Sequence, residues 1–154
     1  MVIYWLKQIN MCLSTKELLD LTIAKEDLVV YKMLDEYGPG WRTPFADDNV
    51  PVDGKMSDPK YIKTRPGSVG LASCIGTLTE PIKNKFTNEY NIGIGFHSYS
   101  TMYDAQCGLS RSLCIMPRTC RLFKAVIPKG TKYVCSNGQV VSEVLNIDLN
   151  NIVG

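Results

Sequence analysis

One histidine, His97, occurs in the 154 residues of this sequence, and the motifs of several enzyme classes are missing. The Gly-x-Ser-x-Gly elbow of esterases does not occur. The glycine-rich stretch at 67–76 lacks the Gly-Lys-Ser/Thr ending that reaches phosphate and magnesium, which excludes a P-loop there. No two cysteines have the Cys-x2-Cys spacing of zinc or thioredoxin-like sites, so we predict no metal site.

Long hydrophobic runs are also missing. No segment approaches the roughly 18 apolar residues that a membrane span requires. The apolar segment at 1–6 is too short for a signal-peptide core and has no basic residue before it. We therefore predict a cytoplasmic protein without membrane contact, in which the six cysteines are free thiols that pack as small hydrophobic residues: Cys12, Cys74, Cys107, Cys114, Cys120 and Cys135.

The composition is that of a globular protein, with 45% apolar and 21% charged residues. Twelve glycines and eight prolines indicate many turns and short elements. We predict an α+β fold: a single domain over 11–154 with a mainly antiparallel sheet, a few short helices and a long irregular loop within 38–70. Residues 1–10 differ in character and are predicted to be an N-terminal extension, which docks on the domain if it is ordered.

Local patterns predict the individual elements. Strands are expected at 27–34, 92–96, 121–127, 131–135 and 140–147, where β-branched and aromatic residues gather. Capping patterns predict a short helix from about Thr15 to Asp20 and another that Thr101 or Ser100 caps and that runs through Ala105 to Cys107. Turns are expected at 128–130 and at Asn137-Gly138, the latter closing a hairpin. The rings of Trp41 and Phe45 should anchor the long loop to the body.

The charge is uneven along the chain, whose formal net charge is +2. Between residues 111 and 132 there are six basic residues and no acid: Arg111, Arg118, Arg121, Lys124, Lys129 and Lys132. Two interpretations stay open, a solvated strand face or a surface for phosphates, a nucleotide or an acidic partner. The cluster lacks the density of a duplex-binding protein, so we do not expect nucleic-acid binding.

The candidate site is the phrase Gly95-Phe96-His97-Ser98-Tyr99. Histidine both donates and accepts hydrogen bonds at neutral pH, and the neighbouring hydroxyls can bind ribose, phosphate or carbonyl oxygens. We predict a ligand-binding surface made of His97, Ser98, Tyr99 and Lys129, with the imidazole open to solvent. The alternative is a structural histidine at the end of a strand.

Three phrases carry a resemblance to a known group of proteins: Ala24 to Lys32, Gly95 to Tyr99, and Phe123 to Tyr133. In this order they resemble small proteins of gut bacteriophages and their Bacteroides-like hosts, which also tend to start Met-Cys-Leu, as at Met11-Cys12-Leu13. The region from Gly38 to Glu89 is unmatched. The resemblance implies an accessory protein of a phage or mobile element acting in the host cytoplasm, and it implies no particular activity.

A fainter similarity is to the ADP-ribosyltransferase fold. Tyr31, Ser98 and Glu143 stand where that family has its tyrosine, serine and glutamate motifs. The sequence departs from the family at Lys32, where arginine is expected, and at Val141, where glutamine or glutamate is expected. If the chain is an enzyme, the resemblance implies NAD as the cofactor and Tyr31, Ser98 and Glu143 as catalytic residues.

We therefore carry three hypotheses. The first is a non-enzymatic accessory protein that needs no cofactor and binds a nucleotide-like molecule or a host protein, with host-defence modulation implied by the resemblance alone. The second is the NAD-dependent transferase. The third is a virion or structural component, and homo-oligomer formation stays open under each.

Overall fold

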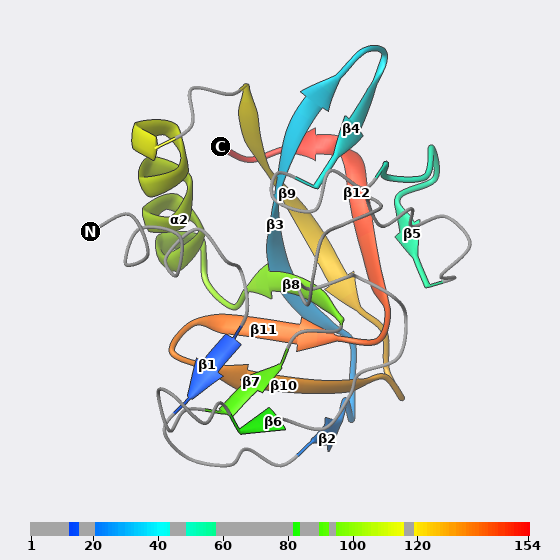
Figure 1. Cartoon of the computed structure of the whole chain (residues 1–154). Coiled ribbons are helices and arrows are strands. Elements are labelled where there is room, and N and C mark those ends of the chain that lie inside the picture. The colour runs from blue at the N-terminus through cyan, green and yellow to red at the C-terminus, as the bar shows by residue number, and fades with distance from the viewer. Residues whose placement is uncertain are drawn as a thin grey trace.

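The computed structural model describes residues 13–15, 21–43, 49–57, 82–83, 90–92, 95–115 and 119–154. The side chains of 13–15, 82–83, 90–92 and 112–115 are not part of this description. The described residues form two antiparallel sheets and one helix, α2 (Met102–Ile115), which lies beside the larger sheet (Figure 1). This agrees with the mainly antiparallel sheet that the sequence predicts.

The large sheet has the strand order β2-β10-β11-β8-β3-β9-β12-β5, with β4 paired to β3. Its strands are β2 (Thr22–Ile23), β3 (Leu28–Tyr37), β4 (Gly40–Arg42), β5 (Lys55–Met56), β8 (Phe96–Tyr99), β9 (Cys120–Ile127), β10 (Lys132–Ser136), β11 (Gln139–Ser142) and β12 (Leu145–Ile152). Strands β10 and β11 cross the direction of β3, β9 and β12, so the sheet is strongly twisted (Figure 1).

Strand β3 is central to this sheet. One edge of β3 pairs with β9 from Leu28 to Asp35. The other edge pairs with β8 only at Tyr31, opposite Tyr99, and with β4 from Asp35 onward. No strand of the described residues therefore pairs with the second edge of β3 between these two contacts, at Lys32, Met33 and Leu34.

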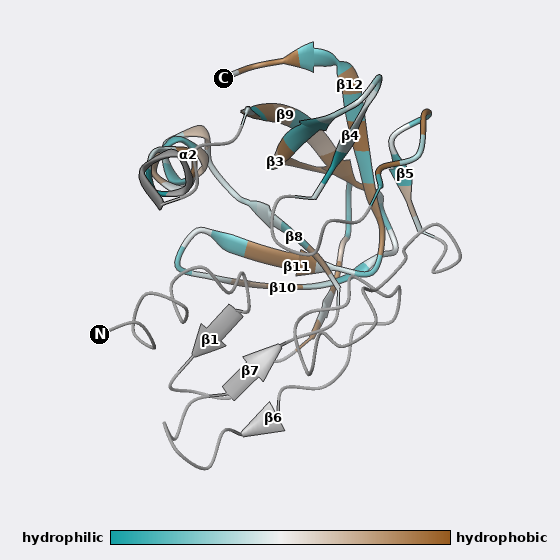
Figure 2. Ribbon diagram, turned by 45° about the horizontal axis from the view of Figure 1, so that its top comes forward, coloured by the Kyte–Doolittle hydropathy of each residue, from teal (hydrophilic) through white to brown (hydrophobic). Residues whose placement is uncertain are grey.

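The hydrophobic core lies on both faces of the large sheet. The larger cluster takes side chains from β3, β5, β8, β9, β11 and β12, among them Phe96 and Phe123, which are fully buried. A second cluster, with Met33, Tyr99 and Leu122, packs against Ala105 and Leu109 of α2. The hydropathy colouring shows apolar segments within β3, β9 and β11, as burial on both faces favours (Figure 2).

Helix α2 begins at a capped end. The Thr101 hydroxyl accepts a hydrogen bond from the Asp104 amide at 3.1 Å and donates one to the Asp104 carboxylate at 2.6 Å. This satisfies one of the free amide groups of the first turn. The helix extends well past Cys107, the end predicted from the sequence.

The second sheet is small and has the order β1-β7-β6, made of β1 (Leu13–Thr15), β7 (Tyr90–Ile92) and β6 (Ile82–Lys83). Strand β1 lies next to β11 of the large sheet (Figure 1).

Several predicted elements are confirmed. Strands occupy 28–37, 120–127 and 132–136, and the Thr131 amide bonds to the Pro128 carbonyl in the turn at 128–130. Asn137 and Gly138 close the β10–β11 hairpin with positive φ angles of 51° and 79°. The Trp41 ring meets Phe123 edge to face, with ring centroids 4.7 Å apart. Trp41 therefore anchors its segment to the core as predicted.

Two predicted strands are wrong. The strand expected at 92–96 is two strands in different sheets, β7 and β8, and Gly95 before β8 has a φ of 137°, which favours glycine. The strand expected at 140–147 is broken at Glu143 and Val144, where the chain passes from β11, beside β8, to β12, beside β9. Of the helix expected from Thr15 to Asp20, only Thr15 is described, and it ends β1.

Other predictions lie outside the described residues. They concern the extension at 1–10, Phe45, Cys12, Cys74, the Cys114 side chain, and the parts of the long loop at 44–48 and 58–70. Of the three cysteines with described side chains, Cys120 is buried, Cys107 is half-buried, and Cys135 is exposed, contrary to its predicted burial. No helix of the described residues has the length and apolar character to cross a membrane.

Candidate functional site

All four residues of β8 are buried, including the imidazole that the sequence predicts to be open to solvent. His97 is only 4% exposed, and it lies within the strand instead of at its end. The physical reason is the position of β8, which has β11 on one edge and meets β3 on the other. The predicted solvent exposure of His97 is therefore wrong.

The register separates the side chains of β8 onto two faces. His97 pairs with Val141, and Ser98 pairs with Val140, whose side chain belongs to the larger core cluster. Directly paired residues point to the same face and successive residues alternate. His97 and Tyr99 thus leave one face of the sheet, whereas Ser98 points toward the larger core cluster.

A buried lysine meets β8 at this point. Lys32 is only 4% exposed, and its Nζ donates a hydrogen bond of 2.6 Å to the carbonyl oxygen of His97. Lys32 follows Tyr31, which pairs with Tyr99, so Lys32 leaves β3 toward the same face as Ser98. In the sequence alone, Lys32 stands out only as a departure from a family motif. The signal for its role is a lysine inside the apolar run from Val29 to Leu34.

The imidazole is held neutral. Burial, and then the nearby Lys32 charge, lower the pKa of His97 from 6.5 to about 3. The Nε2 atom of His97 and the Oγ atom of Ser98 are both buried, and neither has a hydrogen-bond partner among the described residues. An unsatisfied buried polar group costs about 1–3 kcal/mol, so this part of β8 is costly to fold without a ligand.

We name Lys32, His97 and Ser98 the β8 site. These residues lie where β8 leaves the edge of β3, with Lys32 and Ser98 on one face of the sheet and the His97 imidazole on the other. The described residues contain no group of three or more histidine, cysteine, aspartate or glutamate side chains that could hold a metal ion. One face of the β8 site therefore offers a charged hydrogen-bond donor and a hydroxyl, and the opposite face offers a neutral imidazole.

Tyr99 has a packing role. A Cβ atom at Gly108 of α2 would overlap the Tyr99 ring, so the helix and β8 approach closely only because residue 108 is glycine. Burial is the main cause that raises the pKa of the Tyr99 phenol. The Tyr99 ring is buried against α2, so the structure does not support the predicted contact between Tyr99 and a ligand.

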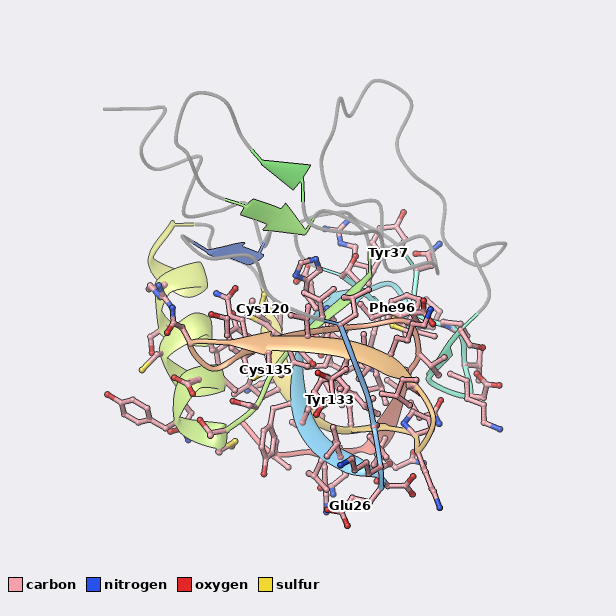
Figure 3. The ribbon with its side chains drawn as sticks, turned by 90° about the horizontal axis from the view of Figure 1, so that it is seen from below. Glu26, Tyr37, Phe96, Cys120, Tyr133 and Cys135 are labelled. Atoms are coloured by element: carbon pink, nitrogen blue, oxygen red, sulfur yellow. The ribbon has the colours of Figure 1, made fainter. Side chains whose placement is uncertain are left out.

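Lys129 is placed apart from the β8 site. It is exposed in the turn after β9, and its amide donates 2.8 Å to the Asp27 carboxylate. Ile127 pairs with Leu28, whereas Tyr99 pairs with Tyr31, so the end of β9 before Lys129 lies three residues along β3, about 10 Å, from the contact with β8. Figure 3 shows Glu26, next to Asp27, at the periphery and far from Phe96.

Of the basic residues at 111–132, Arg118 lies outside the described residues, and Arg121 and Lys124 do not share a surface. Arg121 and Lys124 are three positions apart on β9, so their exposed side chains leave opposite faces. This favours the solvated-face interpretation for these two residues.

The three residues implied by the transferase resemblance are also distributed. Tyr31 pairs with Tyr99 and so points to the face opposite Ser98. Glu143 lies in the break between β11 and β12, where its amide donates 3.1 Å to the Lys132 carbonyl. Tyr31 and Ser98 therefore do not share a face of the sheet.

No family model, no curated protein and no solved structure matches this chain.

Proposed function

We propose that the chain is a non-enzymatic binding protein of α+β class that takes a small nucleotide-like ligand at the β8 site. The observation that supports this is the buried Ser98 Oγ, which has no hydrogen-bond partner among the described residues and shares its face of the sheet with the buried Lys32. A nucleotide offers hydroxyl and phosphate oxygens, which can accept a hydrogen bond from such a hydroxyl. Ligand binding would remove the cost of leaving Ser98 Oγ unsatisfied.

The wider role rests on the resemblance to phage proteins. A phage or mobile element would use such a protein in the host cytoplasm to sequester a signalling nucleotide. The transferase hypothesis receives no support from the register, because Tyr31 and Ser98 leave opposite faces of the sheet.

Thermal unfolding of the full chain with NAD, ADP-ribose and cyclic dinucleotides tests the proposal. A ligand at about 100 times its Kd adds about 2.7 kcal/mol to the unfolding free energy, which raises the melting temperature measurably. We expect at least one of these ligands to do so, and we expect Ser98→Ala to abolish the shift. Val52→Ala serves as the control, because Val52 is 99% exposed and should leave the shift unchanged.

No shift with any of these ligands would contradict the small-molecule proposal. The host-protein alternative would then have the better support, since it has an observation of its own. Tyr37 is 54% exposed near the turn of the β3–β4 hairpin, where the Arg42 guanidinium lies 4.7 Å from its ring centroid. Tyrosine and arginine are enriched among the residues that dominate protein interfaces.

A further inference from the structure

The turn between β10 and β11 brings together an exposed asparagine and a glycine. Asn137 is exposed, and Asn137 and Gly138 have positive φ angles of 51° and 79°, as a type I′ turn in a two-residue hairpin requires. Gly138 has no Cβ atom, so no side chain of its own hinders its backbone nitrogen from approaching the preceding side chain. Asn137 is also the one asparagine of the sequence that is followed by glycine.

From this arrangement we propose that Asn137 is a site of spontaneous deamidation, a covalent modification that needs water and no enzyme. The Gly138 backbone nitrogen loses its proton to a base in the solvent and bonds to the side-chain carbonyl carbon of Asn137. The bond from that carbon to the side-chain nitrogen breaks, ammonia leaves, and a cyclic succinimide remains. Water then opens the ring, which converts the amide into a carboxylate without any change of oxidation state.

Water can open the ring at either of its two carbonyl groups. Opening at the former side-chain carbonyl gives aspartate at position 137 with the ordinary backbone. Opening at the main-chain carbonyl gives isoaspartate, in which the backbone runs through the side chain and is one carbon longer. Aspartate before glycine fits this type of turn, whereas the longer backbone does not fit a two-residue connection between paired strands.

The effect of isoaspartate extends to helix α2, because Gly138 lies against the start of that helix. The Gly138 carbonyl accepts a hydrogen bond of 2.9 Å from the Ser100 amide. The Asp104 carboxylate lies so close to Gly138 that a Cβ atom on this glycine would overlap it. Asp104 also accepts the hydrogen bond from the Thr101 hydroxyl at the helix cap. A longer backbone at position 137 displaces Gly138 and thereby disturbs the first turn of α2.

The folded hairpin slows this reaction without preventing it. The nitrogen attacks from a backbone conformation that the closed turn does not hold, so the reaction proceeds through local opening of the hairpin end. Surface turns open at a lower free-energy cost than core strands do. Asn137 should therefore react more slowly than it does in the unfolded chain, and faster than asparagines that precede larger residues.

Incubation of the full chain at mildly alkaline pH tests the site. Peptide mapping by mass spectrometry follows the replacement of the side-chain NH2 by OH at each asparagine. We expect Asn137 to be modified several times faster than Asn150, which is also exposed but precedes another asparagine. Asn137→Gly removes the reacting amide and tolerates the positive φ, so this variant should stay unmodified at the turn. Equal rates at Asn137 and Asn150, or no modification of Asn137, would overturn the proposal.

A second measurement tests the effect on α2. Chromatography separates the isoaspartate form, and Asn137→Asp provides the same charge on an ordinary backbone. We expect the isoaspartate form to melt at a lower temperature than Asn137→Asp and to exchange the amide hydrogens of the first turn of α2 faster. An isoaspartate form that melts and exchanges like Asn137→Asp would overturn the coupling between the turn and the helix.

Discussion

His97 gives the molecule a pH-dependent stability. Its pKa is about 3 in the folded state and about 6.5 in the unfolded chain, so the unfolded state takes up a proton that the folded state resists. Stability from this residue is fully present above pH 6.5 and is lost as the pH falls toward 3. We expect the unfolding free energy to fall by up to about 1.4 kcal/mol per pH unit in this window.

Urea unfolding at pH 7.5, 6.0 and 5.0 measures this effect, with His97→Gln as the comparison because glutamine does not titrate. Carboxylate groups contribute equally to both proteins, so the difference between the two unfolding free energies isolates the imidazole. That difference should stay constant above pH 7 and change as the pH falls. Parallel curves throughout would show that His97 does not bear this linkage.

Helix α2 depends on Thr101 at its first turn. Replacing Thr101 with alanine removes both hydrogen bonds to Asp104, and we expect a loss of about 1 kcal/mol in unfolding free energy. Thr101→Ser should restore most of it, because serine keeps the hydroxyl. Ser110→Ala is the control on the same helix, since Ser110 is exposed, and chemical denaturation followed by circular dichroism measures all three.

If Thr101→Ala and Ser110→Ala are equally stable, the cap contributes nothing to the fold.

At this scale the sequence predicts an element well when its signal is local. Thr101 caps a helix and Asn137-Gly138 closes a hairpin through contacts within a few residues, and both predictions are confirmed. The break at Glu143 and Val144 has no local signal, because it depends on which strands accept β11 and β12. The same holds for His97, whose burial depends on β11 and β3, distant in sequence.

The β8 site shows this limit most clearly. The phrase around His97 and Ser98 marks the correct segment for the unpartnered polar atoms, but Lys32 joins it only through the fold. A basic residue after a strand favours Lys129 as a ligand-binding residue. The pairing register of β9 with β3 places Lys129 beyond the start of β3, away from the β8 site.

Across the whole molecule, Phe123 is the side chain through which the core connects the sheet to the β3–β4 hairpin. It is fully buried in the larger cluster and meets Trp41 edge to face. Phe123→Ala should cost about 3–5 kcal/mol, since it leaves a cavity between β9 and β4. Val52→Ala, at a 99% exposed position, should change the unfolding free energy by less than about 0.5 kcal/mol.

Denaturant unfolding monitored by tryptophan fluorescence measures both variants, and equal midpoints for the two would contradict this role of Phe123.

The pairing of β3 with β9 has a consequence for synthesis of the chain. The β9 residues that pair with β3 are translated more than 80 residues after it. Until then, the apolar side chains of Val30, Met33 and Leu34 lack the strand that pairs with β3. Contacts between such distant segments form slowly, because a long loop must close first. A ribosome-bound fragment that ends before Cys120 therefore carries an unprotected strand, which makes it a natural substrate for chaperones and proteases.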